Sequence, residues 1–338
     1  MKTWKKAGLT ALAGSLVATS AFSGAMTVSG TANLTYTGNT GAQDSAAATA
    51  ATDLDGNRWG INKTISFSGS GEMDNGWTAS ISQSLSAATT TGLGMTLDMG
   101  DAGTLNYEAS TGARGIGKIK DMMPTADEDA ANGLDANGAS TGGGVSGTVS
   151  GGTTGFHYSK STDMVTFGVG YGPKGQAGGS SGGVSGAGAG ASSTSAYISI
   201  APMDGLDVGF GVGEMAAARA GSNDSTDDYT TAYVTYVYGP VTVGYQSSEV
   251  DTLTSTQSDD EQTKWGVLYA VNDEMSISYQ SIENDDSTVT IDEEATGWSA
   301  SYTVGSMTFK AHQNKGTNLG NAANMESEHT EVGVTFAF

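Results

Sequence analysis

The chain has 338 residues, of which 36 are acidic and 14 basic, and it contains no cysteine. A net charge of −22 argues against DNA or RNA as a partner, because phosphate binding needs a basic surface. The lack of cysteine excludes disulfides and zinc–thiolate sites. With 51 glycines and a hydrophobic fraction of 37%, the composition suits strands with one apolar face better than a thick apolar core.

Residues 1–25 have the features of a secretory signal peptide. Three lysines within the first six residues precede an apolar run over residues 7–22, and small residues follow up to Ala25. The run is too short and too rich in Ala, Gly, Ser and Thr for a membrane-spanning helix, which needs about 20 predominantly apolar residues. We therefore expect export with cleavage before Met26, which leaves 11 basic and 36 acidic residues and a formal charge of −25.

From Met26 onward, apolar and polar residues alternate in segments of about ten, which is the period of a β-strand. In the last segment, Val332, Val334, Phe336 and Phe338 share one face. The predicted strands are 26–37, 58–71, 77–86, 93–99, 104–109, 154–160, 163–172, 192–201, 206–215, 228–239, 240–250, 262–271, 275–284, 292–304, 307–315 and 326–338.

These strands predict an all-β fold, namely a transmembrane antiparallel β-barrel of about 16 strands that forms one domain over residues 26–338. No continuous apolar segment after the first reaches the length of a spanning helix, and in lipid only a closed barrel satisfies the backbone of strands. A soluble sandwich also alternates, but here the second face consists mostly of Gly, Ser, Thr and Asn, as expected for a wet lumen.

The connections between the predicted strands alternate in length, which is typical of bacterial barrels. The short ones consist of turn residues and fall at 73–76, 100–103, 202–205, 239–240, 272–274 and 305–306. The long ones are polar and fall at 38–57, 110–153, 173–191, 216–227, 251–261 and 316–325.

Three stretches resemble the trimeric, about 16-stranded general-diffusion porins of Gram-negative outer membranes. These are the C-terminal strand ending in Phe338, the hairpin over residues 65–85, and the strand end over residues 97–101. The resemblance covers the whole mature chain, although only these stretches are specific. It implies that the outer-membrane assembly machinery recognises the terminal residues Val332, Val334, Phe336 and Phe338.

The resemblance also implies that the long third loop, residues 110–153, folds into the lumen as a constriction. In the family, acidic residues of this loop face basic residues of the wall. The acidic candidates are Glu108, Asp121, Asp127, Glu128, Asp129 and Asp135. The basic candidates, which alternation places on the polar face, are Arg58, Lys264 and Lys310. The family's usual cluster of wall arginines is not visible, and Arg114, Lys118 and Lys120 lie in the loop itself.

Other motifs have simpler interpretations. Residues 112–119 nearly spell a phosphate-binding loop, but Ile119 stands where a hydroxyl is needed. His157, His312 and His329 lie in separate segments, and we predict no metal site and no cofactor. The acidic stretches 258–261 and 283–286 could still hold Ca²⁺ weakly. Lys63 falls on an apolar face, where it marks either a bulge or a subunit interface.

We therefore expect an outer-membrane porin of a Gram-negative bacterium that passes small hydrophilic solutes and ions by passive diffusion. Cations should be preferred, because acidic residues outnumber basic ones at the mouth and in the loop. The expected partners are outer-membrane lipid and lipopolysaccharide, small polar solutes, the assembly machinery and two further copies of the chain in a homotrimer. No residue has a catalytic role. The alternatives are a substrate-specific outer-membrane channel and a secreted all-β adhesin or surface-layer protein.

Overall fold

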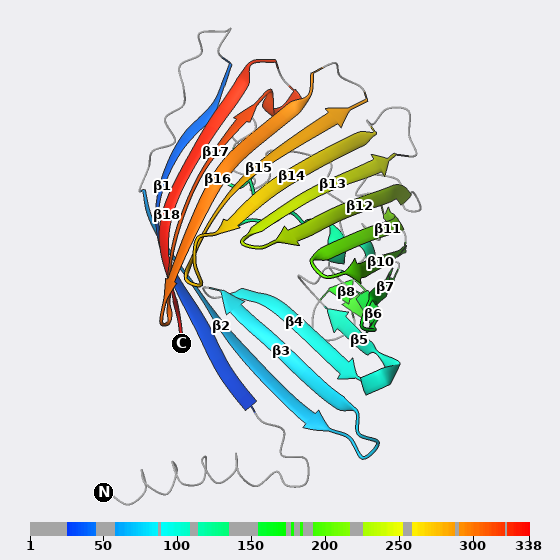
Figure 1. Ribbon diagram of the computed structural model, residues 1–338. Helices are drawn as coiled ribbons and strands as arrows, with labels where there is room; N and C mark the ends of the chain where they lie inside the picture. Colours follow the sequence, from blue (N-terminus) through cyan, green and yellow to red (C-terminus); the bar gives the residue numbers. More distant parts are fainter. Residues whose placement is uncertain are drawn as a thin grey trace, which may run out of the picture.

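Sixteen antiparallel strands form a closed barrel in a computed structural model of the chain (Figure 1). The structure describes residues 26–44, 58–86, 89–108, 114–134, 155–173, 177–178, 183–184, 192–216, 226–252, 259–287, 291–321 and 323–338. Each strand pairs with its neighbours in the sequence of barrel strands, and β1 pairs with β18 to close the ring. The predicted barrel of about 16 strands is confirmed.

The strands match the predicted segments closely in position. The barrel consists of β1 (Met26–Asp44), β2 (Trp59–Glu72), β3 (Thr78–Ser86), β4 (Thr89–Asp98), β5 (Thr104–Glu108), β6 (Gly155–Ser161), β7 (Val165–Gly172), β10 (Ser193–Met203), β11 (Leu206–Ala216), β12 (Thr226–Tyr238), β13 (Val241–Asp251), β14 (Asp260–Ala270), β15 (Met275–Asp286), β16 (Glu293–Val304), β17 (Met307–Thr317) and β18 (Met325–Ala337). A separate two-stranded sheet of β8 (Ala177–Gly178) and β9 (Gly183–Val184) lies between β7 and β10 in the sequence.

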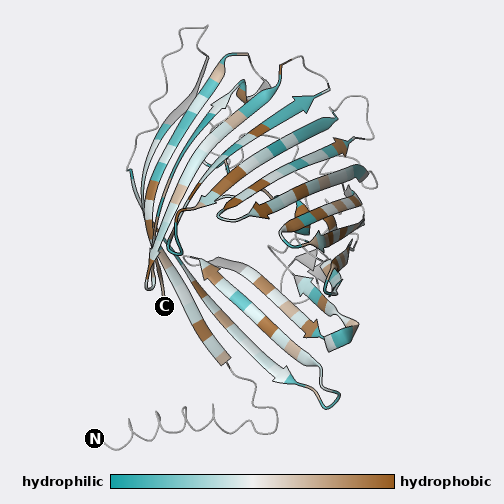
Figure 2. Ribbon diagram, viewed as in Figure 1, coloured by the Kyte–Doolittle hydropathy of each residue, from teal (hydrophilic) through white to brown (hydrophobic). Residues whose placement is uncertain are grey.

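The two faces of the barrel wall are inverted relative to a soluble protein. Large apolar side chains on the outer face are exposed, for example Ile61 at 80% and Val332 at 54%. Polar side chains on the inner face are buried, for example Gln246 at 1%. The alternating bands of hydropathy along the strands are visible in Figure 2. An apolar exterior of this kind suits lipid rather than water.

The barrel closes through the C-terminal residue. The backbone nitrogen of Gly30 donates to the carbonyl oxygen of Phe338 over 2.8 Å, and the nitrogen of Phe338 donates back over 3.0 Å. A Cβ on Gly30 would lie 2.7 Å from the Phe338 ring, so a side chain at this position would have to displace that ring. Val332, Phe336 and Phe338 are exposed on the outer face, and Val334 is half-buried.

Lys63 also lies exposed on the outer face, directly opposite Ala32 in an unbroken register between β1 and β2. The bulge that its position suggested is therefore absent. Within the described residues, no helix has the length and apolar character needed to cross a membrane.

Candidate pore constriction

Residues 114–134 lie along the inner face of the barrel. The segment begins beside β6, β7 and β10, passes β13 and β15, and ends beside β17, β18 and β1, as its hydrogen bonds and packing show. It starts with the short 3₁₀ helix η2 (Gly115–Ile119). Residues 109–113 and 135–154 lie outside the described residues, so the expected loop boundaries at 110 and 153 cannot be compared with the structure.

Two glutamines of the wall hold the backbone of this segment. The Gln246 side chain accepts a hydrogen bond from the Met122 nitrogen over 2.9 Å and donates one to the Ile119 oxygen over 2.8 Å. The Gln280 side chain accepts from the Ala130 nitrogen over 3.1 Å and donates to the Pro124 oxygen over 3.2 Å. Each amide therefore satisfies one donor and one acceptor of a backbone that forms no regular sheet or long helix.

The two ends of the segment are fixed by other polar wall residues. At the start, the nitrogens of Gly115 and Ile116 donate to His157 and to Ser195, over 3.1 and 3.2 Å. At the end, the Asn314 amide donates to the carbonyl oxygens of Asp129 and Asn132 over 3.0 and 2.8 Å. These contacts hold the described segment along most of its length.

Glycines on the inner face make room for the segment. A Cβ on Gly170 would lie 2.6 Å from the Gly115 nitrogen, and one on Gly244 would lie 2.7 Å from Pro124. A Cβ on Gly211 would lie 2.8 Å from the Ile116 side chain. Glycine on this face, which the sequence suggested was a feature of a wet lumen, here also permits close approach of a second backbone.

Apolar side chains of the segment are buried against the wall. Ile119 and Met123 pack with Tyr233 of β12, while Leu134 packs with Ile282 of β15 and with Leu319. Ile282 lies on the inner face, because it is opposite the inner-face residue Lys264 in the β14–β15 register. The barrel interior thus contains small apolar clusters that strict alternation does not predict.

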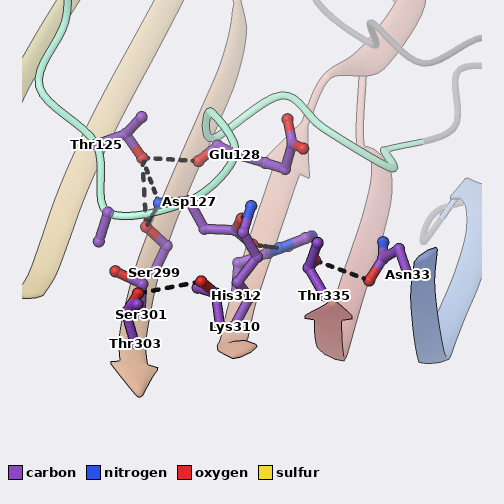
Figure 3. Close-up of polar contacts among 12 residues, drawn as sticks. Asn33, Thr125, Asp127, Glu128, Ser299, Ser301, Thr303, Lys310, His312 and Thr335 are labelled. Carbon is purple, nitrogen blue, oxygen red and sulfur yellow. Dashed lines mark hydrogen bonds and ion pairs between the residues drawn. The ribbon is translucent and has the colours of Figure 1, made fainter. Parts of the chain in front are cut away.

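Asp127 joins the segment to β17 (Figure 3). Its carboxylate pairs with the Lys310 ammonium and lies 3.0 Å from Nδ1 of His312. Its backbone nitrogen donates to the Ser299 hydroxyl over 3.1 Å, and neighbouring Thr125 is bonded to Glu128. Burial alone would raise the pKa of Asp127, but the hydrogen bonds from His312 and Lys310 outweigh it and lower that pKa below its ordinary value.

The other predicted site residues are placed as follows. Asp121 lies 3.7 Å from the ammonium of Lys264, which is buried. Asp129 is half-buried, and its carboxylate accepts a hydrogen bond from the Ala131 nitrogen. Glu128 is exposed. Arg58 is exposed just before β2, and its guanidinium donates to the Tyr36 hydroxyl over 3.3 Å. The Glu108 side chain and the whole of Asp135 lie outside the described residues.

Two histidines that the sequence kept apart lie together. The rings of His312 and His329 stack with centroids 5.3 Å apart, and a Cβ on Gly133 would lie 2.3 Å from the His329 ring. His157 lies elsewhere, stacked on Tyr197 at 6.1 Å. Within the part of the chain that the structure describes, no three His, Asp or Glu side chains are arranged so that they could hold a metal ion.

Carboxylates gather on the inner face at the long-loop ends of the strands. They are Asp227 on β12, Asp260 on β14, Asp286 on β15 and Glu293 on β16. Asp260 and Asp286 are directly opposite each other, and the outward neighbours Glu261 and Asp285 form the next pair. The inner mouth of the barrel is therefore acidic.

A sealed barrel with an apolar exterior, a polar interior and a charged segment inside is the architecture of a transmembrane channel. A family model described as Gram-negative porin matches residues 7–281. The chain belongs to this family of outer-membrane porins, which are known as channels rather than enzymes. Among curated proteins, none matches the chain.

Solved porin structures share the fold. The anion-selective porin from Comamonas acidovorans is 11% identical, with a TM-score of 0.66 over 93% of this chain and 100% of that one. OmpT of Vibrio cholerae is 12% identical, with a TM-score of 0.64 over 95% of this chain and 99% of that one. A variant of the porin of Rh. blastica is 14% identical, with a TM-score of 0.58 over 93% of this chain and 100% of that one. At these identities the similarity concerns the fold alone.

Proposed function

We propose that this porin passes small hydrophilic solutes and ions by passive diffusion, with a size limit set by residues 114–134 and a preference for cations. The size limit is supported by the fixed position of the segment, which Gln246, Gln280 and Asn314 hold against the wall. A rigid obstruction inside a water-filled barrel restricts solutes by radius without any coupled energy source.

The cation preference rests on the acidic inner mouth. Asp227, Asp260, Asp286 and Glu293 share the inner face at one end of the barrel, and the field of such a group concentrates cations at the entrance.

The test is the reversal potential of the purified protein in a planar bilayer under a salt gradient. The wild-type pore should favour cations. The double variant Asp260→Asn/Asp286→Asn should move the reversal potential toward zero. Its matched control is Glu261→Gln/Asp285→Asn, which removes two charges from the adjacent outward positions and should change the potential little. A wild-type preference for anions would refute the cation selectivity.

The proposal includes a homotrimer, the assembly machinery acting on Val332, Val334, Phe336 and Phe338, and export by residues 1–25. It also includes lipopolysaccharide as a neighbour and no resident cofactor.

Like charges stand directly opposite each other at Glu249–Glu261 and Glu261–Asp285 on the outer face, which costs stability unless cations intervene. Weakly held Ca²⁺ would offset this repulsion, and chelation should then lower the melting temperature in lipopolysaccharide-containing bilayers.

A further inference from the structure

The stacked histidines His312 and His329 lie under the end of the inner segment. They are only 2% and 7% exposed, although both stand on the inner face of the wall. Asp127 lies against His312 (Figure 3), and a Cβ on Gly133 would lie 2.3 Å from the His329 ring. Gly133 has a φ of +75°, so glycine suits both this backbone conformation and the close approach. The segment therefore covers both imidazoles.

Each ring has a buried nitrogen that lacks a hydrogen-bond partner among the described residues. These atoms are Nε2 of His312 and Nδ1 of His329, whereas Nδ1 of His312 lies 3.0 Å from Asp127. A neutral imidazole has one N–H group, but a protonated imidazole has two and accepts no hydrogen bond. Protonation would therefore place a second N–H group on a buried nitrogen with no acceptor, which costs the full desolvation of that group.

The charges beside the pair balance one extra proton but not a second. Asp127 pairs with Lys310, and Glu331 is half-buried and directly opposite His312 in the β17–β18 register. Two acids thus stand with one base while both rings are neutral. A first proton on the rings makes this group neutral, whereas a second leaves an unbalanced positive charge in a covered site, where an unpaired charge is costly.

The other residues around the rings do not change this balance. In the segment, Glu128 is exposed to solvent, and the Asp129 carboxylate accepts a hydrogen bond from a backbone nitrogen of the segment itself. On the strands, the inner-face residues directly opposite the rings are, besides Glu331, the uncharged Asn39 on β1, Ser299 on β16 and Asn314 on β17. The balance therefore depends on the two acids, the lysine and the rings.

From these contacts we propose that His312 and His329 form a proton-binding switch, in which uptake of a second proton at acidic pH releases residues 127–134 from the wall. Release opens both rings to water, where each can be protonated, so docking is strongest at high pH and weakens as the pH falls. The rings titrate as a unit, because their centroids are 5.3 Å apart.

The switch goes beyond the proposed diffusion pore and does not depend on its ion preference. At neutral pH the segment stays docked and the size limit is fixed. At acidic pH the end of the segment leaves the wall, while the strands keep their backbone ladder. The middle of the segment stays in place, because the Gln246 amide that holds Met122 does not titrate.

The test is hydrogen exchange of two backbone amides in lipid, from about pH 8 to about pH 4, a range that includes the usual histidine pKa of about 6.5. The Ala130 nitrogen donates to Gln280 in the end that should be released, and the Met122 nitrogen donates to Gln246 in the part that should stay. The ratio of the two rates removes the direct effect of pH on exchange. It should rise about tenfold for each pH unit below the transition, because release takes up one further proton.

Two variants test the charge balance. His329→Gln removes a proton-binding ring and should abolish the rise in the rate ratio. Glu331→Gln removes an acid that balances the first proton, so the rise should begin at a higher pH. A role in packing alone would not move the transition in this direction. Asp127 stays ionised throughout the range, because its partners lower its pKa below the ordinary value.

Two control variants make the test specific. Glu328→Gln changes the exposed residue next to His329 on β18, and His157→Gln changes the histidine that accepts from Gly115 at the other end of the segment. Neither should move the transition at Ala130. A constant rate ratio in the wild type, or a rise that persists in His329→Gln, would overturn the inference. A wild-type protein that shows the transition but does not conduct would instead refute the diffusion pore and support the switch.

Discussion

Replacing Gln246 by alanine tests whether side chains of the wall hold the inner segment in place. The Gln246 side chain is almost fully buried and makes three hydrogen bonds, to the Met122 nitrogen, the Ile119 oxygen and the Thr231 hydroxyl. Alanine removes all three and leaves two backbone groups of the segment buried without partners. The strands of the barrel keep their own backbone ladder, so the damage should be confined to the segment.

Each buried backbone group that loses its partner costs about 1–3 kcal/mol, so the two together cost about 2–6 kcal/mol. At about 1.4 kcal/mol for each factor of ten, this weakens docking by roughly one to four orders of magnitude. Gln246→Glu keeps an acceptor for Met122 but cannot donate to Ile119, so it should show part of the effect. Gln313→Ala is the control, because Gln313 is an exposed outward residue whose side chain accepts a hydrogen bond from the Trp298 indole over 3.2 Å.

Single-channel recording and hydrogen exchange of the Met122 amide measure the outcome. We expect larger or noisier current steps and faster exchange in Gln246→Ala, with wild-type behaviour in Gln313→Ala. The strand content by circular dichroism should stay at the wild-type level in both. If Gln246→Ala left both the current noise and the exchange rate unchanged, the wall glutamines would not hold the segment and the size-limit argument would fail.

Three further outcomes follow from the same contacts. Gly170→Leu should displace the start of the segment and raise conductance, because its Cβ would lie 2.6 Å from Gly115. Because its partners lower the pKa of Asp127, the anchor persists above the ordinary pKa of an aspartate and is lost as the pH falls through the lowered pKa. Current noise should rise at that acidic pH, whereas Asp127→Asn should be noisy at neutral pH. Ile81→Lys, on the outer face in the middle of β3, should cost about 2–4 kcal/mol of stability, and Ser82→Lys on the inner face much less, as measured by urea unfolding in lipid.

The barrel could be predicted from the sequence because its cause is local. Alternation with a period of two, bounded by turn residues, determines each strand, and the lack of a spanning helix leaves closure as the way to satisfy the strand backbones in lipid. The bounds differ by a few residues at most ends, and β1 continues to Asp44, well past the predicted end at 37. That extension depends on pairing with β18, which a local pattern does not contain.

The contacts of the candidate site could be predicted only in part. Alternation placed Lys264 and Lys310 on the inner face, and both face the inner segment. Alternation alone could not show that Asp121 and Asp127 pair with them, because a loop has no register.

Alternation also gave no hint that His312 and His329 stack, since this contact depends on the pairing of β17 with β18. Arg58 was expected at the pore wall, but its guanidinium bonds to Tyr36, whose ring lies on the outer face.

The glycines and polar residues of the inner face have two physical roles, and a sequence pattern does not separate them. A wet lumen and a seat for a second backbone both favour small or hydrogen-bonding side chains. The distinction is burial: Gln246, Gln280 and Asn314 are nearly inaccessible, whereas the residues of β2 and β3 on the far side are covered less. In the proposed pore, the aperture is bounded on one side by a segment held on buried wall residues and on the other by the strands β2 and β3 themselves. Such an aperture needs no hinge, which is the property that the proposed passive diffusion with a fixed size limit requires.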